Sequence, residues 1–212
     1  MNDVNANRLV EYLGSIMESG DLTNDGHCRQ VRRCSELITD KLMQFYPEFG
    51  LTEEDRTRIR LAAASHDVGK IAVPDWILQK PGRLTFEEFE IMKNHTRKGY
   101  KMFQQLLLHV PKDDVESRRL FECCANVCLS HHERYDGGGY PLGISGNDIP
   151  IEAQIVGLAD AYDVLVSERI YKSAYTGEEA FEMIMEGECG VFHPKLIQIF
   201  QMSRMELEEI YE

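Results

Sequence analysis

The sequence lacks a long apolar run, and no stretch approaches the roughly 18 to 20 residues that a helix needs to span a bilayer. Its first residues, MNDVNANRLVEYLG, have neither the basic start nor the apolar centre of a signal peptide. Repeats and low-complexity segments are also absent. From these absences we expect a cytoplasmic protein with no membrane partner.

Basic residues are scarce. Lysine and arginine together number 23 against 36 aspartates and glutamates, which gives a net charge of −13 at pH 7 and a pI near 5.0. A chain this acidic has no broad basic face with which to displace counterions, so long nucleic acid is excluded as a partner. An anionic ligand would instead need local positive charge, and bound metal is the obvious source.

The sequence has no cysteine spacing typical of a disulfide framework. Its six cysteines lie mostly inside helix-like segments, at Cys28, Cys34, Cys123, Cys124, Cys128 and Cys189. No second cysteine pair stands at zinc spacing, so we interpret them as packing residues in a reducing compartment.

Strand-like alternation is not found, whereas apolar residues recur at three- and four-residue steps through most of the 212 residues. This pattern predicts an all-α fold, a compact helical bundle. We expect helices over 4–18, from 27 to about 45, from about 53 to 66, over 85–92, 95–109, 115–130 and 151–166, and from near 176 and 194. Residues 1–21 are expected as an N-terminal helix, an appendage or linker to the main domain of residues 22–212.

Local signals refine this expectation. The threonines Thr52, Thr85 and Thr176 each precede acidic residues, a pattern typical of helix N-caps. Trp76 is expected as a packing anchor in a loop. The acidic C-terminus, residues 205–212, is expected as a solvated helix end.

The stretch LAAASHDVGKI, residues 61–71, holds the strongest local signal. Its alanines favour a helix, at the end of which stands the doublet His66-Asp67. Imidazole nitrogen and carboxylate oxygen suit borderline divalent metals, and a carboxylate can bridge two of them. Gly69 would let the backbone pass close to a ligand, and Lys70 would add a point charge. Taken alone, such a doublet is more often a helix cap or a salt-bridged surface pair.

Histidines gather near the expected helix ends. Five of the seven do so, namely His27, His66, His95, His131 and His132. Adjacent residues on a helix point about 100° apart, so the last two can face one point only where a helix gives way to a loop. Asp160 and Asp163 lie one turn apart on one helix face. Five imidazoles and two or more carboxylates are more ligands than one tetrahedral site needs, and they suit two adjacent metals that share Asp67. Two divalent cations would leave the site with net positive charge, which favours an anionic phosphodiester as the ligand.

The segment from Glu133 to Pro150 predicts a long glycine-rich loop. Gly137, Gly138 and Gly139 would allow close backbone approach, and Tyr140 offers a ring that can stack on a base. The loop therefore fits a substrate wall. The alternative is that the glycines merely shape a long connection.

Together these pieces resemble the HD-GYP family of the HD phosphohydrolase superfamily. The matching text is HDVGK at 66–70, HTRKG at 95–99, HHERYDGGGYP at 131–141, IP at 149–150, ADAYDVL at 159–165 and RIYK at 169–172, with HCRQVRR at 27–33 upstream. The similarity runs from about residue 22 to 205. It implies an all-helical phosphodiesterase that hydrolyses cyclic di-GMP to the linear dinucleotide pGpG, to GMP or to both.

The resemblance also implies a set of site residues. The metal ligands would be His27, His66, Asp67, His95, His131, His132 and Asp160, around two divalent ions, iron or manganese before other transition metals. Asp67 would bridge the ions, and the nucleophile would be a metal-bridging hydroxide. The substrate would contact Lys70, Gly139, Tyr140, Pro141, Arg169 and Lys172, and Asp163 would be an acid beside the cluster. Lys70 or a metal-bound water would protonate the leaving oxygen.

Two positions depart from the family pattern. Thr23 stands where some members carry a glutamate that helps to hold a third metal, so two metals are expected. His193 stands where an aspartate usually precedes the last helix, and we interpret it as a changed N-cap.

Several alternatives stay open at this point. The substrate could be another cyclic dinucleotide, such as 3′,3′-cyclic GMP-AMP, or the chain could be a non-catalytic module that binds nucleotide or protein. A hydrolase acting on mononucleotides leaves the long loop and RIYK without a role. A sensor or receiver domain, or a second copy of the chain, is the expected protein partner.

Overall fold

The computed structural model describes residues 3–20, 26–167 and 174–211. None of these residues forms a strand, which confirms the all-α prediction. The α-helices are α1 (Asp3–Gly20), α2 (His27–Phe45), α3 (Glu53–Ala64), α4 (Asp75–Leu78), α5 (Phe86–Leu107), α6 (Val115–Ser130), α7 (Ile151–Val166), α8 (Gly177–Met185), α9 (Pro194–Met202) and α10 (Arg204–Glu208). Three short 3₁₀ helices join them, η1 (Pro47–Phe49), η2 (Val68–Ala72) and η3 (Gly146–Asp148).

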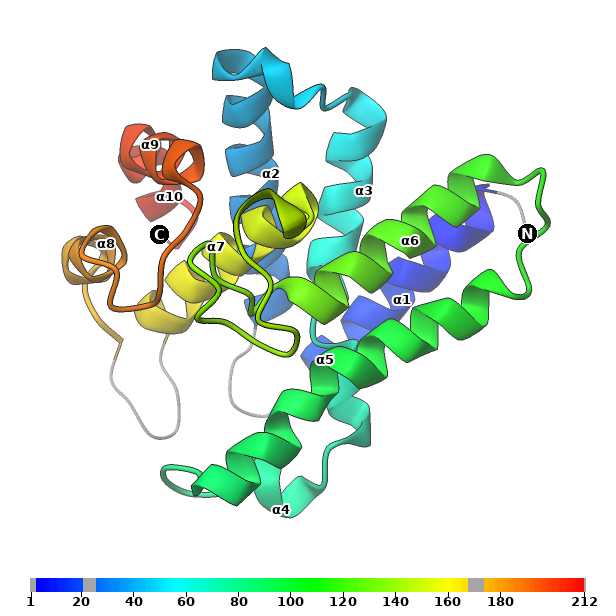
Figure 1. The fold of residues 1–212 in the computed structure, drawn as a ribbon, viewed down its shortest axis with the longest axis horizontal. Coiled ribbons are helices and arrows are strands. Elements are labelled where there is room, and N and C mark those ends of the chain that lie inside the picture. Colours follow the sequence, from blue (N-terminus) through cyan, green and yellow to red (C-terminus); the bar gives the residue numbers. More distant parts are fainter. Residues whose placement is uncertain (1–2, 21–25, 168–173, 212) are drawn as a thin grey trace.

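The helices pack around two antiparallel pairs. Helices α5 and α6 lie side by side, and so do α2 and α3, while α7 crosses the bundle behind the glycine-rich loop (Figure 1). One apolar cluster takes in residues from every α-helix except α4, and the side chains of Ile38, Phe103, Phe121, Ile155 and Phe200 in it are fully buried. Because the pairs converge near the C-terminal end of α3, the residues that follow this helix come to lie at the centre of the molecule.

Capping explains where three of the helices begin. The side chains of Thr52, Thr85 and Thr176 each accept a hydrogen bond from the backbone three residues on, and an acidic side chain returns the bond to the threonine backbone. Such reciprocal capping satisfies amide groups that a helix start leaves without partners. The three cap predictions are confirmed.

Helix α5 corrects the prediction of two helices over 85–92 and 95–109. It is one continuous helix from Phe86 to Leu107. No proline or glycine interrupts residues 92–95, and Asn94 Nδ2 donates to the carbonyl oxygen of Glu90 at 3.0 Å, so the asparagine is accommodated inside the helix. His95 therefore lies mid-helix rather than at a helix start.

Two other expectations were wrong. Trp76 lies in α4 with 60% of its surface exposed, so it is no packing anchor. The C-terminal segment is not a solvated helix end, because Leu207 is 1% exposed and Tyr211 reaches a buried aspartate. Leu207, Ile210 and Tyr211 recur at three- and four-residue steps and pack in or against the core, while Met205 and Glu209 stay exposed.

Helix α1 packs against α3 and α6, with Ala6 and Val10 fully buried. A Cβ on Gly14 would lie 2.8 Å from the backbone oxygen of Ala64, so α1 approaches the end of α3 closely. Among the residues that the structure describes, no helix is both long enough and apolar enough to traverse a bilayer.

Candidate metal centre

Five helices deliver the predicted ligand side chains to one buried point. They are His27 at the start of α2, His66 and Asp67 just past α3, His95 within α5, His131 and His132 just past α6, and Asp160 within α7. All of them are buried except His132, which is half-buried. The structure therefore brings every predicted metal ligand together, although these residues span 134 positions of the chain, from 27 to 160.

Backbone carbonyl groups outside the site orient three of the histidine rings. In three of them Nδ1 lies against a carbonyl oxygen of the preceding turn, at 2.8 Å from Ala63 for His66, 2.8 Å from Met92 for His95 and 2.9 Å from Val127 for His131. A carbonyl oxygen can only accept a hydrogen bond, so Nδ1 carries the proton in each ring. The other nitrogen, Nε2, points into the site, which is the side on which a metal ligand must present its lone pair.

Four buried atoms at this point form no hydrogen bond with any described residue. They are Nε2 of His66, His95 and His131, and Oδ1 of Asp67. A buried polar atom without a partner typically costs roughly 1–3 kcal/mol. Divalent cations bound by these atoms would satisfy all four, and nitrogen with carboxylate oxygen is a donor set for transition metals. The residues therefore fit a metal ion.

Asp67 separates two groups of ligand atoms. Its Oδ1 lies 3.3 Å from Nε2 of His95 and 3.9 Å from that of His131. Its Oδ2 lies 3.2 Å from Nε2 of His66 and 4.0 Å from that of His27. One carboxylate thus faces both groups, one oxygen toward each.

His27 is held on both sides by α7. Its Nδ1 lies 2.5 Å from Oδ2 of Asp163, and its Nε2 lies 3.6 Å from Oδ1 of Asp160. The two aspartates lie one turn apart on the same face of α7, as the sequence predicted, and both face the ring of His27. Asp163 is fully buried and stands behind the ring, so it orients His27 rather than facing the centre.

The two groups differ in their charge environment. Burial lowers the pKa of His131 to about 3, which leaves this ring neutral. Burial acts in the same direction on His66, but the carboxylates of Asp67 and Asp160 outweigh it and raise the pKa of His66 to about 9. The carboxylates therefore favour positive charge at the point that His66 faces.

Lys70 and Tyr140 lie at the border of the centre. The ammonium group of Lys70, from η2, forms an ion pair with Oδ2 of Asp67. The ring of Tyr140 stacks on that of His132, with centroids 4.6 Å apart and planes at 28°, and meets Phe89 edge-on. One face of the tyrosine ring is thus already occupied by a predicted ligand.

Three glycines touch the backbone of the predicted ligands. A Cβ on Gly69 would lie 1.9 Å from the carbonyl oxygen of His95, one on Gly157 would lie 2.3 Å from that of His131, and one on Gly139 would lie 2.5 Å from that of His132. Gly69 and Gly139 were expected to admit a ligand or substrate. Instead each admits neighbouring protein backbone, and this close packing sets the spacing between the elements that carry the ligands.

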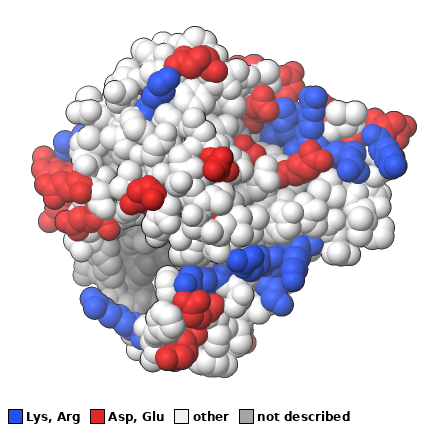
Figure 2. All heavy atoms as spheres, viewed as in Figure 1, with Lys and Arg blue, Asp and Glu red and all other residues white. Residues whose placement is uncertain are grey.

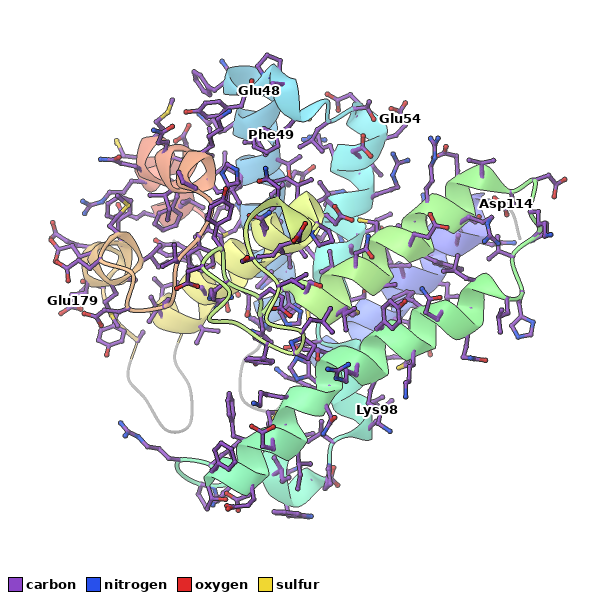
Figure 3. The ribbon with its side chains drawn as sticks, viewed as in Figure 1. Glu48, Phe49, Glu54, Lys98, Asp114 and Glu179 are labelled. Carbon is purple, nitrogen blue, oxygen red and sulfur yellow. The ribbon has the colours of Figure 1, made fainter. Side chains whose placement is uncertain are left out.

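Sequence reasoning missed several supporting side chains. Nη2 of Arg97 donates to the carbonyl oxygen of Pro141 at 2.9 Å, which ties the loop to α5. Arg134 donates to the carbonyl oxygens of His131, Glu133 and Cys189, and Glu133 accepts from the Leu142 amide at 2.6 Å. The only signal for these contacts in the sequence was that Glu133 and Arg134 directly follow the two histidines in HHER. Basic side chains lie along α5 on the face in view, where Lys98 is exposed (Figures 2 and 3).

Some predicted residues lie outside the described part of the chain. These are Arg169, Lys172 and Thr23. His193 is described and is the N-cap of α9, where its Nδ1 accepts from the Lys195 amide at 3.0 Å. Its interpretation as a cap is confirmed.

Comparison with known proteins assigns the family. Residues 24–195 match the HD domain family. The chain belongs to this family. Over 203 residues this chain is 36% identical to a cyclic di-GMP phosphodiesterase of Thermotoga maritima, an alignment that covers 96% of the chain and 50% of that protein. It is 40% identical over 213 residues to the cyclic di-GMP phosphodiesterase response regulator RpfG of Xanthomonas campestris, with 99% of this chain and 52% of that protein covered.

Other relatives extend the picture. A 3'3'-cGAMP-specific phosphodiesterase 2 of Vibrio cholerae is 34% identical over 191 residues, which cover 90% of this chain and 33% of that protein. The solved structure of Bd1817, a HDG"Y"P protein of Bdellovibrio bacteriovorus, shares the fold with a TM-score of 0.60 at 22% identity, covering 97% of this chain and 61% of that chain. The chain spans between a third and about half of the length of these curated relatives.

Proposed function

We propose that this HD domain is a metal-dependent phosphodiesterase that hydrolyses cyclic di-GMP to pGpG, to GMP or to both. The observation that supports the proposal most directly is the buried cluster around Asp67. In this cluster Nε2 of three histidines and Oδ1 of Asp67 have no hydrogen-bond partner among the described residues. Support also comes from the names of the relatives, which are cyclic di-GMP phosphodiesterases at 36% and 40% identity.

Two divalent ions, iron or manganese, are proposed for the centre. His27, His66 and Asp160 with Oδ2 of Asp67 would hold one, and His95, His131 and His132 with Oδ1 of Asp67 would hold the other. The opposite facing of the two oxygens of Asp67 supports this division. When bound, such a pair supplies Lewis-acid charge to a phosphoryl oxygen and lowers the pKa of a water molecule.

The chain's own groups would then bind and orient the substrate. Lys70 would hold the scissile phosphate and give its proton to the leaving oxygen, since its ion pair with Asp67 keeps the ammonium group at the centre's edge. Asp163 would keep His27 in position. Contacts to the nucleotide are proposed for Gly139, Tyr140 and Pro141 of the loop and for Arg169 and Lys172.

The test is turnover of cyclic di-GMP by protein loaded anaerobically with iron(II) or manganese(II). The matched control is His66→Ala/Asp67→Ala, which removes ligands of both groups. We expect turnover in the wild type and none in the double variant. Turnover that persists in the double variant refutes the proposed site.

The same assay separates the other functions. Because one relative is named for 3'3'-cGAMP, that nucleotide is the second substrate. Faster hydrolysis of 3'3'-cGAMP reassigns the substrate. Protein that binds neither metal when anaerobically loaded is a binding module and not a phosphodiesterase.

Partner and location remain proposals too. A sensor or receiver domain, or a second copy of the chain, is the proposed protein partner, and sedimentation of the purified chain tests the second copy. The cytoplasm is the proposed location, which cell fractionation tests.

A further inference from the structure

Tyr211 lies in the C-terminal segment that follows α10, far in sequence from every predicted ligand. Its hydroxyl donates to Oδ1 of Asp163 at 3.0 Å. The other oxygen of this carboxylate, Oδ2, meets Nδ1 of His27 at 2.5 Å. Among the described residues, the hydroxyl of Tyr211 reaches one oxygen of the fully buried Asp163, and the ring of His27 reaches the other.

The hydroxyl of Tyr211 donates to Oδ1 of Asp163, and Oδ2 is the acceptor that favours the His27 tautomer with its proton on Nδ1. In that tautomer Nε2 of His27 is the nitrogen available to a metal, and it faces Asp160 and Asp67. A carboxylate behind a histidine ligand fixes both the tautomer and the ring orientation.

The tail that carries Tyr211 is fastened to α2, the helix that carries His27. Nη1 of Arg33 donates to the carbonyl oxygen of Ile210 at 3.1 Å. The hydroxyl of Tyr211 also lies 3.5 Å from Sγ of Cys34, which stands two helical turns after His27 on the same face. The tail thus reaches α2 and Asp163 at the same time.

We propose that Tyr211 is a positioning residue of the metal centre, which acts through Asp163 to hold His27 in its metal-binding orientation. The inference deepens the proposed function and rests on the metal site assigned there. Loss of the phenol oxygen leaves Oδ1 of Asp163 buried without its donor. The carboxylate is then free to turn away, and His27 loses its fixed orientation.

The test is the affinity for manganese(II), measured by titration against the electron paramagnetic resonance signal of the free ion. Tyr211→Phe removes one oxygen atom and keeps the ring. We expect its apparent Kd to rise about tenfold, within the range of roughly 10- to 100-fold found for groups that orient metal ligands. The matched control is Tyr46→Phe, which removes a hydroxyl bonded to Gln198 at an exposed site and is expected to leave the Kd unchanged.

A double-variant comparison separates positioning from a general structural role. If Tyr211 acts through Asp163, Tyr211→Phe adds no further weakening to Asp163→Asn. Independent effects that multiply in the double variant overturn the inference, as does a Kd for Tyr211→Phe within twofold of that of Tyr46→Phe. Should Tyr211→Phe not fold, Arg33→Ala releases the same segment at an exposed hydrogen bond, and an unchanged Kd in that variant overturns the inference.

Metal binding and turnover are measured separately. A wild type that binds manganese but leaves cyclic dinucleotides intact refutes the proposed function alone. Equal manganese affinities in wild type and Tyr211→Phe refute the role of Tyr211 alone.

Discussion

Gly69 offers the sharpest test of how the centre is assembled. Its backbone crosses α5 so closely that a Cβ would lie 1.9 Å from the carbonyl oxygen of His95 and 2.5 Å from the amide nitrogen of Gly99. Both neighbours are backbone atoms of a helix and cannot rotate away. Gly69→Ala therefore forces η2 and α5 apart, and it does so without any backbone strain, because φ of Gly69 lies outside the left-handed region.

The size of the movement follows from the geometry. Ordinary contact begins at 3.4 Å, so the distance from Cβ to the His95 oxygen must grow by about 1.5 Å from 1.9 Å. Asp67, two residues before Gly69, has its Oδ1 only 3.3 Å from Nε2 of His95, and the same movement separates these ligand atoms. Overpacking of a buried site costs about 1–3 kcal/mol, and a misplacement of about 1 Å can cost roughly 100-fold in rate.

We expect Gly69→Ala to lower the melting temperature by about 2–12 °C, to weaken manganese binding by about 10- to 100-fold, and to slow turnover by about 100-fold. The assays are thermal unfolding by circular dichroism and the manganese titration. The control is Gly138→Ala, whose Cβ would meet only the movable carboxylate of Asp136, at 3.2 Å, on an exposed loop. A Gly69→Ala protein that melts within 2 °C of the control and binds manganese equally well would refute this account.

Three further predictions concern the loop, the thiols and the metal. Arg97→Ala removes the hydrogen bond that ties the loop to α5. We expect KM for cyclic di-GMP to rise about fivefold, which corresponds to roughly 1 kcal/mol, with kcat little changed. The control is Lys98→Ala, on the exposed side of the same helix. Burial raises the pKa of Cys34 to about 12, so this thiol stays protonated at pH 8, and we expect the native protein to react fast with Ellman's reagent only at the half-buried Cys189. Two or more fast thiols would contradict this. Manganese at about 100 times its Kd should stabilise the fold by about 2.7 kcal/mol, which a chelator reverses, and an unchanged melting temperature would count against a native metal site.

The types of the ligand residues and the ends of several helices could be predicted from the sequence. The caps at Thr52 and Thr85 were predictable because capping is a local interaction between residues three positions apart. The meeting of His131 with His66 was predictable from their places at helix ends and from the family resemblance. The continuity of α5 was not, because the short polar stretch at Asn94 resembles a break until its side chain is seen to bond within the helix.

Contacts that depend on tertiary packing could not be predicted from the sequence. Tyr211 and Asp163 are 48 positions apart, and Asp163 and His27 are 136 apart, so no periodicity connects them. The glycines misled for a related reason. A glycine signals close approach of some atom to the backbone, but only the fold tells whether that atom belongs to a ligand or, as at Gly69, to the carbonyl of another helix.

The centre thus depends on groups that do not themselves face its ligand atoms. Gly69 and Gly157 set the spacing between backbones, and Tyr211 with Asp163 sets the orientation of one ring. A count of ligand residues alone predicts that any chain that keeps all seven binds metal equally well. The packing predicts weaker metal binding for Gly157→Ala. Its Cβ would lie 2.3 Å from the carbonyl oxygen of His131 and would displace the end of α6, which positions the His131 ring. Such a variant keeps every ligand, and we expect it to lose manganese affinity by at least tenfold in the same titration. Affinity equal to that of Gly138→Ala would show that the ligands position themselves.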